Sequence, residues 1–135
     1  MSRGLRNNNP GNIRHNKDVF QGEKTPSTDA AFKQFTSMAY GYRAMFVTLG
    51  TYLSRGKNTI DKIIRSWAPP NENNTQGYIR HVEQFSGVDR NKVLTACSGD
   101  DYIRIAAAMS RIENGVPAEM KEVLSGFELQ NKIRK

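Results

Sequence analysis

The stretch Arg6–Ala44, RNNNPGNIRHNKDVFQGEKTPSTDAAFKQFTSMAYGYRA, decides how the rest of the chain is arranged. It opens with an asparagine-rich turn at residues 7–12, because short polar side chains and glycine favour tight turns. Pro26 and the surrounding Ser and Thr residues argue against a helix before Ser37. We therefore expect a small β-containing or irregular N-terminal lobe, whose short strands would be residues 12–14, 19–21 and 31–35.

Beyond Ser37 the apolar residues recur at helical spacing. Between Met38 and Leu53 they occupy one face of a helix, which Ser37 or Thr36 can cap. Later segments repeat the pattern and predict about five or six helices in all. The fold class is thus α+β but mainly α, in one domain spanning residues 1–135. The further helices are expected from Thr59 to Ala68, from Asn74 or Thr75 to Gly87, from Asp89 to Ala96, from Asp100 to Asn114, and from Pro117 onward.

Composition narrows the class of protein. The 135 residues include 20 Lys and Arg against 13 Asp and Glu, which gives a net charge of +7. A basic surface suits a polyanionic partner such as nucleic acid, an anionic membrane or a bacterial wall. The cations are spread along the chain without a groove-reading motif, so we expect no specific nucleic-acid partner.

Other classes are excluded by what the sequence lacks. A single cysteine precludes an internal disulfide, and the two histidines stand far apart without metal-ligand spacing, so no metal and no cofactor are expected. The N-terminus lacks the apolar core of a signal peptide. No apolar run approaches membrane-spanning length, so membrane insertion is not expected.

Several segments together resemble a known family. Four of them are similar to phage and prophage virion proteins described as lysozyme-like or lytic-transglycosylase-like. They are RNNNPGNIR at residues 6–14, the Gly22-Glu23 pair, the pattern FxxFxSxxYGYRA from Phe32, and TIxxIIxxWAPPxENNTxxY from Thr59. The similarity extends from Arg3 to Val88. A weaker similarity links the same pieces, in the same order, to bacterial cell-wall glucosaminidases.

The resemblance implies a lysozyme-like fold and cleavage of peptidoglycan glycan strands, as a lytic transglycosylase or a muramidase. It also implies a virion-associated or phage-encoded protein of the host cytoplasm that acts on the cell wall, with other virion proteins as further partners. One departure matters. In the glucosaminidases the principal acid precedes the asparagine-rich segment, whereas here only Met1 to Arg6 precede it, without an acid.

Cleavage of a glycosidic bond needs a carboxylic acid that protonates the leaving oxygen. Glu23 is the first candidate for this general acid, since it follows Phe20 and Gly22 in a turn where an aromatic ring could raise its pKa. The other interpretation is a solvated glutamate paired with Lys24. Asp29 is the candidate partner carboxylate, or else a residue that caps a turn. The family chemistry allows a lytic transglycosylase to work with one acid.

Further residues are candidates for substrate binding because they carry amide, guanidinium, phenol or carboxylate groups. Each has a structural alternative: Asn12 could hold the turn, Arg43 could be solvated, and Tyr78 could have its ring in the core. The second functional hypothesis is a catalytically inactive virion structural protein that keeps the lysozyme-like shape and binds glycan or other virion proteins. The binding candidates are Asn12, Arg14, Tyr40, Arg43, Glu72 and Tyr78.

Overall fold

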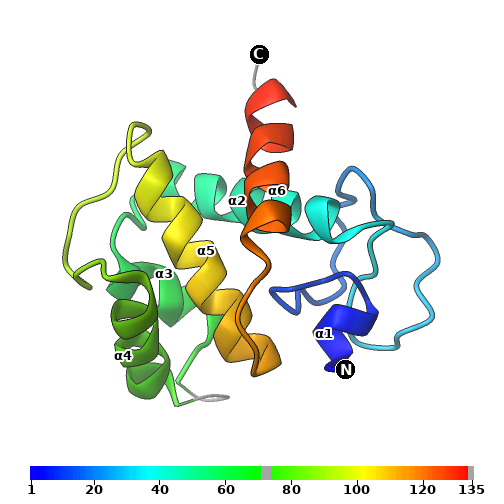
Figure 1. Ribbon diagram of the computed structural model, residues 1–135, viewed down its shortest axis with the longest axis horizontal. Helices are drawn as coiled ribbons and strands as arrows, with labels where there is room; N and C mark the ends of the chain where they lie inside the picture. The colour runs from blue at the N-terminus through cyan, green and yellow to red at the C-terminus, as the bar shows by residue number, and fades with distance from the viewer. Residues whose placement is uncertain (71–73, 134–135) are drawn as a thin grey trace.

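The computed structural model describes residues 1–70 and 74–133, with side chains as far as residue 130. Within these residues the fold is mainly helical, as predicted, and six helices surround the core (Figure 1). None of them combines the length and apolarity needed to cross a membrane. The helices are α1 (Arg3–Arg6), α2 (Met38–Ser54), α3 (Ile60–Trp67), α4 (Thr75–Ser86), α5 (Gly99–Asn114) and α6 (Met120–Ile133).

Helix α2 lies at the centre of the fold. The Ser37 hydroxyl caps its start by accepting from the Tyr40 amide, and Gly56 follows its end in a left-handed conformation. The face predicted from the sequence is confirmed, with Tyr42, Met45 and Leu49 fully buried. This face packs into a core shared with α3, α4 and α5, to which Ile63, Ile79, Ile105 and Met109 belong.

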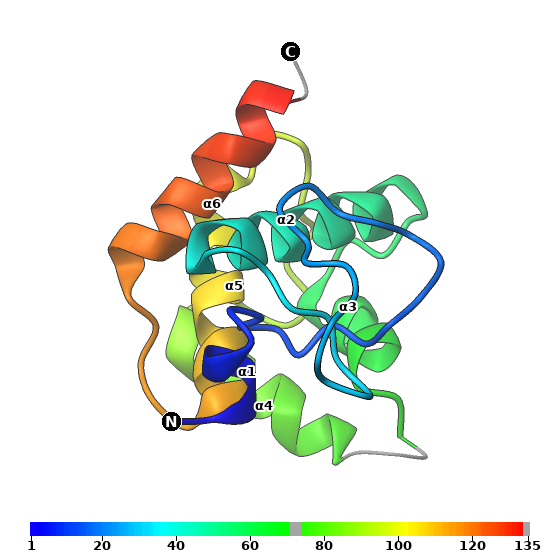
Figure 2. The same ribbon diagram turned by 90° about the vertical axis from the view of Figure 1, so that its right-hand side faces the viewer.

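Helix α6 crosses α2 at close range (Figures 1 and 2). Gly126 makes this approach possible, because a Cβ there would stand 2.8 Å from the Ala39 carbonyl oxygen and 2.8 Å from the Arg43 amide nitrogen. Val123 faces the core, whereas the neighbouring Leu124 is 50% exposed. The helix begins at Met120 rather than at Pro117.

The N-terminal segment, residues 7–37, forms no regular strand. The strands expected at 12–14, 19–21 and 31–35 reduce to two isolated antiparallel bridges, Arg14 with Phe32 and Glu23 with Phe35. Side chains satisfy much of the backbone in place of a ladder, and the first three asparagines of the opening turn, Asn7, Asn8 and Asn9, reach residues 29–35. Polar side chains that bond to the backbone compete with regular structure.

The helix expected from Asp89 to Ala96 is also absent, and residues 88–98 form a loop with short turns. The Asp89 carboxylate accepts from the Asn91 amide and so favours a turn. The Leu94 amide donates to the Asn58 carbonyl 2.8 Å away, which fixes the loop against the start of α3. Leu94 is buried through this tertiary contact rather than through a helical face.

Candidate functional site

A cleft with a volume of about 760 Å³ lies between the N-terminal segment and helices α2 and α3. In Figure 2 the N-terminal segment runs alongside these two helices. The cleft has three walls. One is residues 11–16 and 18–21, the second is the end of α3 with Ser66, Trp67 and Pro69, and the third is one face of α2 with Arg43, Val47, Thr48, Thr51, Tyr52 and Arg55.

The charges of this cleft are mainly positive. Arg14, Arg43 and Arg55 line it, and Asp18 is the one carboxylate among the described residues that does so. Arg14 is exposed and stacks over the Phe32 ring, with its guanidinium carbon 5.0 Å from the ring centroid. His15 also lines the cleft and contacts the Asp29 carbonyl oxygen at 2.7 Å. Such a cleft favours an anionic ligand.

Two aromatic side chains lie side by side along the α2–α3 wall. The Tyr52 and Trp67 rings meet edge to face, with centroids 6.3 Å apart and planes at 81°. Trp67 also covers the asparagine-rich turn, since a Cβ on Gly11 would stand 2.8 Å from its ring. An aromatic surface beside polar donors is an arrangement suited to a ligand that has both apolar faces and polar edges.

Arg43 forms part of the floor of the cleft. Its side chain starts from the first half of α2 and is only 7% exposed. Its Nε is buried without a hydrogen-bond partner among the described residues. Burial lowers the pKa of the guanidinium from its ordinary value, yet an arginine remains protonated in proteins.

Glu23 lies away from the cleft lining, in a buried ion pair. Lys33 Nζ donates to both carboxylate oxygens, at 3.1 and 3.0 Å, and the Phe20 amide donates to Oε1. The Lys33 and Glu23 side chains are only 1% and 5% exposed. These donors occupy both carboxylate oxygens, and the side chain does not line the cleft, so Glu23 is poorly placed to protonate a glycan bound there. The assignment of Glu23 as the acid therefore stays a prediction that this geometry does not favour.

Asp29 fastens the start of the chain to the N-terminal segment. Arg3 donates to both of its oxygens, each at 2.7 Å, and Asn7 and the Ala31 and Phe32 amides donate as well. The Arg3 guanidinium, followed by Asn7, holds the pKa of Asp29 far below its usual range. This side chain behaves as the turn-capping residue that the sequence allowed.

Asn12 and Tyr78 meet at a residue that we did not single out in the sequence. Glu113, at the end of α5, accepts from Asn12 Nδ2 and from the Tyr78 hydroxyl, both at 2.8 Å. Desolvation raises the pKa of Tyr78 well above its ordinary value, and Glu113 adds to the effect. Asn12 Oδ1 is buried without a partner among the described residues. Asn12 also lines the cleft, so it joins this cluster to the cleft wall.

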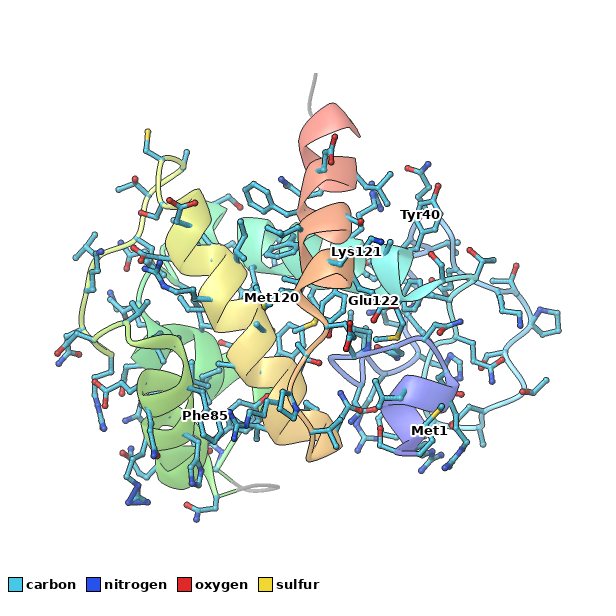
Figure 3. All side chains as sticks on the ribbon, in the orientation of Figure 1. Met1, Tyr40, Phe85, Met120, Lys121 and Glu122 are labelled. Atoms are coloured by element: carbon cyan, nitrogen blue, oxygen red, sulfur yellow. The ribbon has the colours of Figure 1, made fainter. Side chains whose placement is uncertain are left out.

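Of the predicted binding residues, Asn12, Arg14 and Arg43 come together in the cleft, whereas Tyr40 and Tyr78 do not line it. Tyr40 covers Gly22 on the side of α2 that meets the N-terminal segment (Figure 3). Glu72 lies outside the described residues. The sequence did contain a signal for Arg55, because positions 43, 47, 51 and 55 share the α2 face opposite the apolar stripe.

Comparison with known proteins identifies a phage relative. The chain is 38% identical over 132 residues to protein P5 of Pseudoalteromonas phage PM2, and the match covers 94% of this chain and 81% of that protein. No family model matches the chain.

Proposed function

Since the chain belongs to the family of protein P5 of Pseudoalteromonas phage PM2, we propose that it is a virion protein that binds glycan strands of the bacterial wall without cleaving them. The observation that carries the proposal is the cleft, which presents three arginines and a single described carboxylate, Asp18. A binding site needs donors and shape, whereas a glycosidase needs a protonated acid at the scissile bond.

The cleft offers the groups that a charged glycan would use. Trp67 and Tyr52 provide aromatic surface for the apolar faces of sugar rings. Arg14, Arg43 and Arg55 provide donors for carboxylates on the peptide-bearing sugars. The net charge of +7 would draw the protein toward an acidic wall.

Binding is tested by sedimentation with purified peptidoglycan sacculi. The protein should pellet with sacculi, and Trp67→Ala should weaken this, because it removes aromatic surface from the cleft wall. Phe85→Ala is the matched control, since Phe85 is a half-exposed aromatic residue on α4 that does not line the cleft. Equal sedimentation of the unmutated protein and Trp67→Ala would move glycan binding away from this cleft. No sedimentation at all would refute the function.

Glycan-strand cleavage is the second candidate, and Glu113 is the observation that favours it. Glu113 is half-buried and accepts from two neutral side chains rather than from a cation. One of these, Asn12, reaches the cleft wall. Unlike Glu23, Glu113 is not held in an ion pair with a described residue, and one hydrogen bond joins it to the cleft wall, which suits a group that must reach a bound glycan.

A zymogram with mass spectrometry of soluble products separates the two candidates. The unmutated protein should release no products if it only binds. If products appear, Glu23→Gln, Asp29→Asn, Glu72→Gln and Glu113→Gln identify the acid, because the true general acid contributes roughly 10²–10⁴-fold. A loss of this size at Glu23 alone would restore the sequence-based mechanism, and a loss at Glu113 alone would establish the second candidate.

A further inference from the structure

Two buried cationic residues, Lys33 and Arg43, lie close to the cleft and differ in the hydrogen bonds that their side chains make. Lys33 donates to both oxygens of Glu23 and to the Asp18 carbonyl, at 2.7 Å, so its three protons are used. Arg43 makes no hydrogen bond and no ion pair through its side chain with any residue that the structure describes. Its buried Nε is therefore a donor without an acceptor among the described residues, which is costly and which proteins usually avoid.

The surroundings of Arg43 define what could satisfy it. Its α2 neighbours along the cleft are Val47 and Thr48, and Phe20 lies on the N-terminal wall. None of these carries a negative charge, and Asp18, the one carboxylate of the described lining, makes no ion pair with Arg43, so we look for the partner in a ligand. A guanidinium group presents a planar fork that matches an oxyanion.

We propose that Arg43 is an oxyanion subsite at the floor of the cleft, which takes one carboxylate group of a peptide-bearing glycan strand. The proposal rests on the proposed binding function and adds the group that is recognised. One buried arginine suits one fixed carboxylate. A nucleic-acid backbone would need several cations aligned along its phosphates, whereas Arg43 is buried and the other two arginines of the described lining, Arg14 and Arg55, are exposed.

The proposed subsite also predicts how the loss of Arg43 changes the stability of the free protein. If Arg43 is kept for a ligand, its removal should relieve the cost of the unpaired buried Nε donor in the free protein. A residue with a structural role would have the opposite signature, since its loss would lower the melting temperature. Stability and binding should therefore change in opposite directions at this one position.

The test uses Arg43→Met, which removes the charge but keeps an unbranched stem. Calorimetry with a soluble disaccharide-peptide from peptidoglycan should show a Kd weakened by about 10- to 100-fold, the range expected for hydrogen bonds to a charged group. Chitotetraose, which carries no carboxylate, should bind the variant and the unmutated protein equally. The Tm of the free variant should be unchanged or higher.

Two further variants control for charge and for folding. Arg80→Met makes the same change in net charge on an exposed part of α4, away from the cleft, and should leave both Kd values unchanged. Arg43→Lys keeps the charge but loses the fork, so it should weaken disaccharide-peptide binding less than Arg43→Met does.

The outcomes distinguish the subsite from the function it rests on. If the unmutated protein binds neither probe, the proposed function fails and the subsite with it. If it binds both probes and Arg43→Met leaves the disaccharide-peptide Kd unchanged, the function stands and the subsite is wrong. A lower Tm in both Arg43 variants would make the arginine structural. Displacement of the disaccharide-peptide by a short oligonucleotide, with tighter binding of the latter, would replace the carboxylate by phosphate.

Discussion

The N-terminal segment and the helical body bury their inner residues by different means. In the helical body, apolar side chains at helical spacing form the core, and Ile63, Ile79 and Ile105 are completely buried in it. The segment instead buries Asn9 and Lys33, and their side chains bond to backbone carbonyls within it. The body therefore depends on volume and shape, whereas the segment depends on matching each donor with an acceptor.

This difference explains why carboxylates in the segment are poor guides to function. Glu23 and Asp29 are each surrounded by donors, and each supports the fold of a region that has almost no regular secondary structure. Arg43, on α2 in the body, has no such partner among the described residues. A polar residue in this protein is therefore a candidate for binding when the local network leaves it unsatisfied.

The largest effect is expected from Lys33→Met. The change leaves Glu23 buried without its ammonium partner, which typically costs 3–5 kcal/mol, so we expect the free energy of unfolding to fall by about 4 kcal/mol. Urea denaturation followed by circular dichroism measures it.

The double variant Glu23→Leu with Lys33→Met is the control, because it removes both charges and should recover most of the loss. A loss below about 1 kcal/mol in Lys33→Met would mean that Glu23 finds solvent easily. The segment would then be looser than its contacts suggest, and Glu23 would become available for chemistry.

The next effect is expected from Asn9→Ala. Asn9 is completely buried, donates to the Ile13 and Lys33 carbonyls and accepts from the Ile13 amide. Removing it leaves several buried backbone groups unpaired, so we expect a loss of about 3 kcal/mol in urea denaturation. Asn91→Ala, on an exposed turn, should stay within about 0.5 kcal/mol of the unmutated protein. Equal losses in Asn9→Ala and Asn91→Ala would show that the buried hydrogen bonds of Asn9 stabilise the N-terminal segment no more than an exposed turn does.

The helices could be predicted from the sequence because their signals are local. Ser37 and Thr59 cap the helices that they were expected to cap, and the apolar face of α2 is the one observed. Leu94 is buried although the helix expected from Asp89 to Ala96 is absent, because its side chain joins the core while its backbone amide bonds to the distant Asn58 carbonyl. Apolar residues in a short run cannot reveal whether a helix or a tertiary contact buries them.

The candidate site was harder to predict because its partners are far apart in sequence. Nothing near Glu23 indicates that Lys33, ten positions on, will pair with it, and the alternative interpretation of Glu23 had paired it with Lys24. Glu113 was missed entirely, since it meets Asn12 across 101 positions. Arg43 was found because the helical period alone places it opposite the apolar stripe of α2.

Acid titration tests how much the contacts of Asp29 with Arg3 and Asn7 stabilise the fold. The Arg3 and Asn7 contacts depress the pKa of Asp29 in the folded state, so this carboxylate contributes stability that is present above its unfolded pKa of about 4. That contribution is lost progressively as pH falls below about 4 toward the folded pKa. Asp29→Asn should lower the free energy of unfolding at pH 7 and make its decline in acid less steep. Parallel curves for both proteins would show that Asp29 is not coupled to folding.

The smallest effect concerns the junction between the two regions. Glu113 receives Asn12 from the N-terminal segment and Tyr78 from α4, so its carboxylate joins both kinds of structure. Tyr78→Phe keeps the ring that packs on the core but removes the hydroxyl donor. Glu113 retains Asn12, so we expect a loss of only about 1 kcal/mol, the usual net worth of one hydrogen bond. Urea denaturation measures this, with Tyr40→Phe as the control that should cost almost nothing. A loss above about 3 kcal/mol at Tyr78 would show that Glu113 cannot keep its charge without the phenol, which would make the cluster a structural clasp and weaken the case for Glu113 as an acid catalyst.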